Sequence, residues 1–276
     1  MPAYRGLPGR LVIGTVPLTL MRHPPASLTL AAALLLLPAA APARSPGDPV
    51  RLVWVEGDVA GTSTIYGPDG GEPIGFIEYR QTRHGDRLSC VRIAHFRDGS
   101  SDEDTADARV EGTLEALAGR SIIRDADGVS VADVAIDVAG GRLRASWGRG
   151  SRRRTLEERV TLPKATYWGP LIFIVLKNFD ANAEDGRLVF RTVAPTPRPR
   201  ALDLELARGP STVLERTGAR LATRRFELGP TIHWTVDPLL RLVLPHATFW
   251  MLPGEPPALA RFTGPRNYAR EAIVIQ

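Results

Sequence analysis

The residues that could carry out chemistry in this chain are not gathered into a known catalytic motif. Its histidines beyond the N-terminal region show neither the His-x-x-x-His nor the His-Glu-x-x-His spacing of a zinc site: His84, His95, His233 and His246. The chain also lacks the Gly-x-Ser-x-Gly turn of serine hydrolases and the Ser-x-x-Lys pair. We therefore predict that the protein is not an enzyme and uses no metal or cofactor. An unrecognised hydrolase is the alternative.

The densest group of carboxylates has a composition that could bind Ca²⁺. It consists of Asp102, Glu103 and Asp104, with Asp98 and Asp107 nearby. Calcium prefers several carboxylate oxygens, but the ligand pattern and the glycine of an EF-hand loop are missing. We therefore expect these acids to form a solvated turn between two strands.

The only cysteine is Cys90, so the chain cannot form an intramolecular disulfide and must be stabilised by packing. It lies in the strand-like stretch Leu-Ser-Cys-Val-Arg-Ile-Ala, residues 88–94. We expect Cys90 to be a small buried apolar side chain rather than a reactive thiol.

The aromatic residues favour a different activity, the binding of an apolar ligand. Large aromatic side chains that line a concave sheet would suit a lipid-like molecule. The candidate ligand-binding residues are Tyr167, Trp168, Phe173, Phe179, Trp234, Phe249 and Trp250. Ordinary core packing is the alternative explanation for the same residues.

Short strands between turn signals dominate the rest of the chain. Leu202, Leu204 and Leu206 alternate with Asp203 and Glu205, which is the pattern of a strand with one buried and one wet face. The same alternation occurs in residues 134–138, 232–236 and 273–275, and turn signals at 83–86, 140–141 and 148–151 join neighbouring runs into hairpins. The pattern predicts a mainly β fold, a curved antiparallel sheet or half-barrel.

Residues 171–179 interrupt this alternation with an almost continuous apolar run. Pro170 suits the first position of a helix, and Lys177 suits the C-terminal end of one. A helix that is apolar all round must be buried, so we expect it to lie across the concave face of the sheet. A buried strand is the alternative, because isoleucine and valine are frequent in this run.

A proline-rich connector spans residues 194–200. Its composition indicates a rigid, extended segment, which could divide two lobes. Because the strand pattern resumes directly after it, one continuous sheet is the alternative.

Residues 21–43 have the three parts of a secretory signal peptide: a basic start, an apolar run at residues 28–37 and the small residues Ala41-Pro42-Ala43. The apolar run is too short to span a bilayer. We predict cleavage after Ala43, a periplasmic location and a single β-rich domain at residues 44–276. Residues 1–20 are then an upstream extension of the start site, and no transmembrane segment follows cleavage.

The charge of the chain argues against nucleic acid as a partner. The formal net charge is +5, and residues 1–43 contribute three arginines and no acid, so removing them lowers it to +2. A basic turn at residues 148–154 could contact an anionic envelope surface. A solvated edge that blocks aggregation is the favoured explanation of this turn.

Several short stretches, taken in order, resemble an uncharacterised family of exported proteins from Gram-negative bacteria. They are Gly75-Phe76, residues 97–104, Leu162-Pro163, Trp168-Gly169-Pro170 with Leu176-Lys177-Asn178, Ala194-Pro195-Thr196-Pro197-Arg198 and Phe262-Thr263-Gly264-Pro265. The resemblance implies an envelope location and, more loosely, a curved antiparallel sheet similar to that of periplasmic lipoprotein carriers. It implies no functional residues.

Together these observations predict a periplasmic binding or carrier protein for an apolar ligand, such as an acyl chain or another lipid-like molecule. The prediction rests on compartment, amphipathic strands and analogy of fold, so it is a hypothesis about a class of ligand. An envelope scaffold that binds another protein through its surface is the main alternative.

Overall fold

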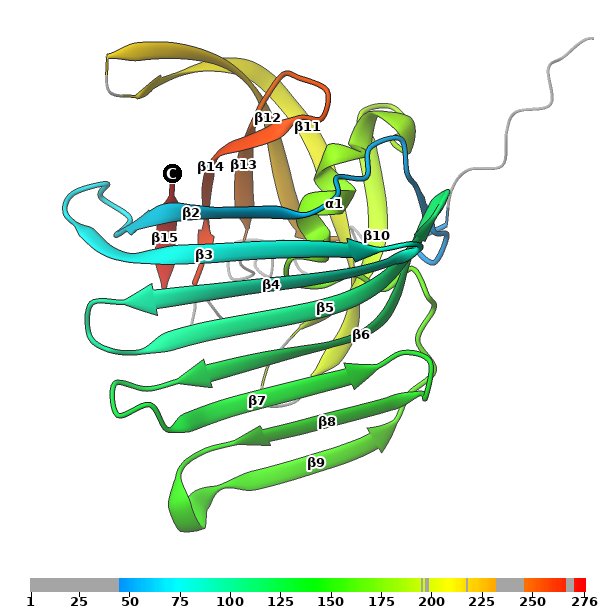
Figure 1. Ribbon diagram of the computed structural model, residues 1–276, viewed down its shortest axis with the longest axis vertical. Coiled ribbons are helices and arrows are strands. Elements are labelled where there is room, and N and C mark those ends of the chain that lie inside the picture. Colours follow the sequence, from blue (N-terminus) through cyan, green and yellow to red (C-terminus); the bar gives the residue numbers. More distant parts are fainter. Residues whose placement is uncertain (1–44, 195, 197–198, 217, 232–245, 267–270) are drawn as a thin grey trace, which may run out of the picture. The chain divides into compact units, whose positions relative to one another are not determined.

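The chain folds into one large antiparallel sheet with one α-helix, as the computed structural model shows (Figure 1). The structure describes residues 45–276 except 195, 197–198, 217, 232–245 and 267–270. The sheet and the helix belong to one compact unit, Ala43–Gln276. The predicted signal peptide, the predicted strand at 232–236 and Trp234 lie outside the described residues.

The described residues contain fifteen strands, one α-helix and two short 3-10 helices. The strands are β1 (Val50–Arg51), β2 (Val59–Tyr66), β3 (Pro73–His84), β4 (Arg87–Phe96), β5 (Ser101–Glu111), β6 (Thr113–Arg124), β7 (Ser130–Asp137), β8 (Arg142–Trp147), β9 (Arg154–Arg159), β10 (Arg187–Ala194), β11 (Arg200–Arg216), β12 (Ala219–Pro230), β13 (Ala247–Leu252), β14 (Ala258–Pro265) and β15 (Ala272–Ile275). The helices are α1 (Leu171–Lys177), η2 (Gly150–Arg152) and η3 (Phe179–Ala181).

The strand order shows two meanders joined at one seam. Strands β2 to β9 follow one another across the sheet, and so do β10 to β15. The chain passes from β9 through α1 to β10 at the opposite edge, and β15 then pairs with β2. The sheet is not closed, because β9 and β10 form its two edges. Strand β1 pairs with the start of β6.

Alternating burial confirms the strands that the period-two pattern predicts. Leu206 is fully buried in β11, and its neighbour Glu205 lies on the other face opposite Val189 of β10. In β7, Val134 and Ile136 are 3% and 5% exposed. The inward side chains of many strands form one continuous apolar core with α1. A curved, mainly β sheet with one buried helix, as predicted, is therefore the observed fold.

The outer face is polar and carries ion pairs between adjacent strands. Arg120 of β6 binds Asp133 of β7 through two hydrogen bonds of 2.8 and 2.6 Å. Arg191 of β10 likewise lies 2.8 Å from Asp203 of β11. These pairs explain why acids alternate with leucines in β11, since one face of the strand packs and the other remains wet.

The apolar run at 171–179 is helical rather than a buried strand. Lys177 lies in the last turn of α1, as the sequence predicts, and Pro170 is its N-cap residue, one position before the predicted first position of the helix. Leu171, Val175 and Leu176 are at most 2% exposed. The helix is short, with seven residues, so packing against the sheet rather than intrinsic propensity stabilises it.

The sheet continues across the proline-rich connector. Strands β10 and β11 pair over their whole common length, from Arg187 opposite Ala207 to Ala194 opposite Arg200. The connector therefore joins two neighbouring strands of one sheet.

Helices that could cross a bilayer are absent from the described part of the chain. Its one α-helix is far shorter than the roughly 20 residues that a membrane-spanning helix needs.

Candidate functional site

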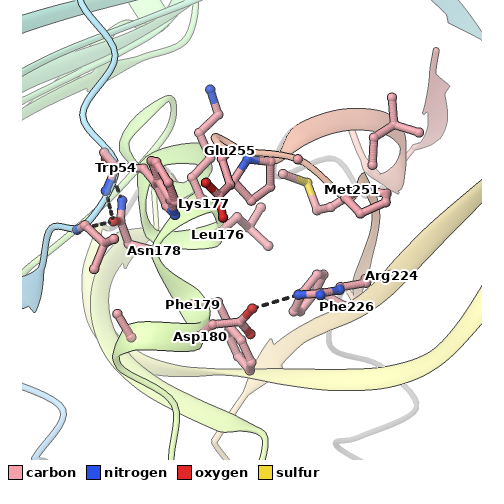
Figure 2. A pocket seen from close by; sticks show the side chains of 16 residues that line it. Trp54, Leu176, Lys177, Asn178, Phe179, Asp180, Arg224, Phe226, Met251 and Glu255 are labelled. Atoms are coloured by element: carbon pink, nitrogen blue, oxygen red, sulfur yellow. Dashed lines mark hydrogen bonds and ion pairs between the residues drawn. The ribbon is translucent and has the colours of Figure 1, made fainter.

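The candidate site is a pocket of about 230 Å³ at the C-terminal end of α1 (Figure 2). Four parts of the chain line it. They are the segment between β1 and β2, the end of α1 with η3, the inner face of β12, and the end of β13 with the loop that follows. We call residues 52–58, which connect β1 to β2, the strap.

The floor of the pocket is apolar. Leu176, Phe179, Phe226 and Met251 line it, and each is at most 3% exposed. The rings of Phe179 and Phe226 meet edge to face with centroids 4.9 Å apart, a favourable arrangement for aromatic pairs. This floor continues the core of the sheet, so an apolar group entering the pocket would meet only carbon and sulfur there.

Charged side chains surround this floor, and most are paired with each other. Lys177 forms an ion pair with Glu56 of the strap. Asp180 accepts hydrogen bonds from both Arg224, at 2.7 Å, and Arg208 (Figure 2 shows the first). Because these charges neutralise one another, the rim has no strong preference for an anionic or a cationic ligand.

Asn178 fixes the strap as one wall of the pocket (Figure 2). Its Oδ1 accepts hydrogen bonds from the backbone N–H groups of Val53 and Trp54 at 2.7 and 2.8 Å. Its Nδ2 donates to the carbonyl oxygens of Trp54 and Ile174 at 3.0 and 2.9 Å. One buried amide therefore satisfies the strap backbone, which has no strand partner here, and also the end of α1.

A second asparagine extends this attachment by one helical turn. Asn182 accepts from the N–H of Arg51 at 2.7 Å and donates to its carbonyl oxygen at 2.8 Å. The strap and the end of α1 are thus held together by side-chain amides, and not by packing alone.

A buried polar network lies beside the strap. Gln81 donates to the carbonyl oxygens of Glu56 and Gly57, and the hydroxyl of Tyr79 donates to Gln81 Oε1 at 2.8 Å. Burial raises the pKa of the Tyr79 phenol well above its ordinary value and that of the Cys90 thiol to about 11. Cys90 is 1% exposed, as expected for a small apolar side chain, and it remains a thiol at neutral pH.

Of the seven aromatic residues predicted to bind ligand, the six that the structure describes do not all line the pocket. Phe179 lines the pocket. Phe173 lies between Tyr79 and Phe249, with ring centroids 6.4 and 6.2 Å away. Trp250 follows Phe249 in β13 and therefore faces the other side of the sheet, where Arg261 stacks on it at 5.3 Å.

The other two described members of this set have structural contacts. The hydroxyl of Tyr167 accepts from the N–H of Val50 and donates to the carbonyl oxygen of Leu114. The indole of Trp168 packs closely over Gly119 and donates to the carbonyl oxygen of Thr105.

Four residues of the pocket were not predicted from the sequence: Asn178, Arg224, Phe226 and Met251. Only Asn178 carried a local signal, as an asparagine directly after a helix.

The expectation of a solvated turn at the acidic group is wrong. Residues 101–111 form β5, and Asp102 and Asp104 face inward, where they are 5% and 7% exposed. Arg266 Nε lies 3.2 Å from Asp102 Oδ2, and Arg92 pairs with Asp104. These two arginines compensate the burial of the carboxylates. Asp98 alone lies in the turn, before Ser100.

Because Asp102 and Asp104 are paired with arginines, their carboxylates are not free to coordinate a metal ion. Burial raises the pKa of Asp102, although its ion pair with Arg266 acts in the opposite direction. Throughout the described ranges, no group of three or more His, Cys, Asp or Glu side chains is placed to hold a metal ion.

Comparisons of the chain with known protein families, with curated proteins and with solved structures gave no match.

Proposed function

We propose that the protein is a non-enzymatic binding or carrier protein for an apolar ligand, such as one acyl chain of a lipid or of a lipoprotein anchor. The observation that carries the proposal is the pocket at the end of α1, whose floor is apolar and whose rim is charged. The predicted export signal supports a place in the cell envelope, where such ligands occur.

The floor could provide enough binding energy for a short chain end. Burial of one methylene group contributes about 0.8 kcal/mol, so roughly six methylenes would contribute about 5 kcal/mol. Contact with Leu176, Phe226 and Met251 would remove these groups from water. The pocket volume of about 230 Å³ lies below the ~300–1,000 Å³ of sites that enclose a drug-sized ligand. The pocket therefore suits the end of one chain.

Most charged groups of the rim are engaged with each other, which supports binding rather than catalysis, although Glu255 lines the pocket without an ion pair among the described residues. Lys177 is engaged by Glu56, and Asp180 is shared by two arginines. A nucleophile or general base needs an available lone pair and a partner that activates it. The paired groups of this rim serve each other instead.

Titration with a fluorescent fatty acid tests the proposal. Val53 lines the pocket from the strap and is 51% exposed, so Val53→Asp should fold and should weaken binding several-fold. Val129 lies between β6 and β7, is 46% exposed and does not line the pocket. Val129→Asp makes the same change of charge and should bind the probe as the wild type does.

Two results would contradict the proposal. One is that the wild type binds no acyl probe, and the other is that Val53→Asp and Val129→Asp weaken binding equally. Either result would favour the alternative function, an envelope scaffold that binds another protein through its surface.

A further inference from the structure

The hairpin of β11 and β12 extends beyond the strands on either side of it. Strand β10 pairs with β11 only as far as Ala207, and β13 pairs with β12 only from Arg224 onward. Between these points residues 212–216 and residues 219–223 pair only with each other. We call residues 211–216 and 219–223 the ribbon. It can be followed in Figure 1 as the yellow hairpin that projects past β13.

The ribbon carries apolar side chains on both of its faces. Val213 lies opposite Ala222 on one face, and Leu214 lies opposite Leu221 on the other. Val213 is 51% exposed, and the two leucines are half-buried. Single exposed hydrophobic residues are ordinary on proteins, but here one exposed valine and two half-buried leucines lie in two adjacent residue pairs of a two-stranded element. An isolated hairpin of this kind is at best marginally stable in water, so a covering environment would stabilise it.

The end of the ribbon has an excess of positive charge. Its charged residues are Arg216, Arg220 and Glu215, all exposed, which give it a net charge of +1. No ion pair joins either arginine to another residue in the part of the chain that the structure describes. By contrast, the arginines at the base of the hairpin, Arg208 and Arg224, are both bound to Asp180. Arg216 lies opposite Ala219 and therefore remains available for external anions, and Arg220 lies opposite Glu215 without forming an ion pair with it.

We propose that the ribbon docks on a bilayer surface that contains anionic lipid. The proposal rests on the proposed function, because a carrier of acyl chains must meet the membrane that holds them. Arg224 connects the two features, since it lines the pocket and pairs with the first residue of the ribbon, Ser211. The ribbon thus projects from the rim of the pocket.

Apolar groups on both faces favour a lipid interface over a protein surface. A protein groove covers one face of a two-stranded ribbon, whereas the interfacial layer of a bilayer surrounds both. The free edges of the ribbon limit its depth, because unpaired backbone N–H and C=O groups cannot enter hydrocarbon. With the ribbon lying in the interfacial layer, Val213 and Leu214 would contact lipid there. Arg216 and Arg220, which lie nearer the turn, would extend their long side chains back to lipid phosphates.

Vesicle flotation tests the docking of the ribbon. The wild type should bind vesicles of phosphatidylcholine with phosphatidylglycerol more tightly than vesicles of phosphatidylcholine alone, and added salt should weaken binding. Arg216→Gln and Arg220→Gln should each lower the partition coefficient about fivefold. Val213→Asp should lower it as well. The matched control, Arg152→Gln with Arg154→Gln, removes two exposed charges from the other basic turn and should have no effect.

Binding of an acyl probe without vesicles separates this inference from the proposed function. The ribbon variants should bind the probe as the wild type does, because none of the changed residues lines the pocket. If the wild type binds vesicles but not the acyl probe, the proposed function is contradicted and the docking of the ribbon still stands. Absence of vesicle binding by the wild type, or an equal loss in the control at Arg152 and Arg154, would overturn the docking of the ribbon.

Discussion

The side-chain amide of Asn178 and the backbone of Trp54 are joined by two hydrogen bonds, one in each direction. Trp54 donates its N–H to Oδ1 at 2.8 Å, and Nδ2 donates to the carbonyl oxygen of Trp54 at 3.0 Å. This arrangement resembles the pairing of a strand residue, with a side chain in place of the neighbouring strand. The wall of the pocket therefore depends on one residue at the end of α1.

Replacement of Asn178 should loosen the strap. Asn178→Ala leaves the N–H groups of Val53 and Trp54 without their acceptor, so it should lower the free energy of unfolding by about 1–3 kcal/mol. Hydrogen exchange should become faster at both amides. Asn182→Ala is the matched control and should accelerate exchange at Arg51 while Trp54 stays protected. Unchanged exchange at Trp54 in Asn178→Ala would contradict this role.

Gly119 should be required for the position of Trp168. A Cβ atom at residue 119 would lie 2.0 Å from Nε1 of the indole, so Gly119→Ala must displace the ring. We expect a loss of about 1–3 kcal/mol in the free energy of unfolding and a change in tryptophan fluorescence. Gly61→Ala adds the same methyl group where no atom lies within 4 Å and should change stability by less than about 0.5 kcal/mol. Equal effects at the two positions would refute the contact.

Asp102 and Asp98 should affect the pH dependence of stability in opposite directions. Burial raises the pKa of Asp102 in the folded protein, so the folded state holds its proton more tightly than the unfolded state. This carboxyl therefore lowers the free energy of unfolding as pH rises from the ordinary pKa through the raised one. Relative to wild type, Asp102→Asn should gain stability over that acidic range.

Asp98 provides the control of opposite sign. Hydrogen bonds from Ser100 lower its pKa, so its contribution is present above the ordinary pKa and is lost as pH falls through the lowered one. Asp98→Asn should therefore lose stability relative to wild type as pH rises over the same acidic range. Denaturant unfolding at a series of pH values measures both differences, and slopes of the same sign would contradict the assignment.

The sequence also predicts export, with cleavage after Ala43. N-terminal sequencing of the protein from a periplasmic fraction should begin at Arg44. A protein that keeps Met21, or that fractionates with the cytoplasm, would contradict the predicted location and weaken the proposed function.

Local sequence patterns were sufficient to predict the strands and the helix. Leucines alternating with acids placed β11, and Pro170 with Lys177 bounded α1. The same periodicity could have separated Phe249 from Trp250, because adjacent residues of a strand face opposite sides. It could also have placed Asp102 and Asp104 on the inner face, since the alternation continues to Ala106.

The pocket depends on contacts between distant parts of the chain, and this is why the sequence did not reveal it. Asn178 binds residues more than a hundred positions earlier in the sequence. Arg266, which compensates the buried charge of Asp102, also lies more than a hundred positions from its partner in the sequence. Neither partner can be identified from periodicity or spacing. The pattern defines which face of a strand is buried, but not which distant residue will meet it.

The pairing of β15 with β2 has a consequence for how the chain folds. Ile275 lies opposite Ile65, and Thr64 exchanges two backbone hydrogen bonds with Gln276. The two meanders can therefore join only after nearly the whole described chain has been synthesised. Contacts between such distant segments slow folding, because the entropy of closing a long loop must be lost before the contact forms. Until then the facing edges of β2 and β14 remain open to incorrect pairing, so we expect slow, chaperone-sensitive maturation of this protein.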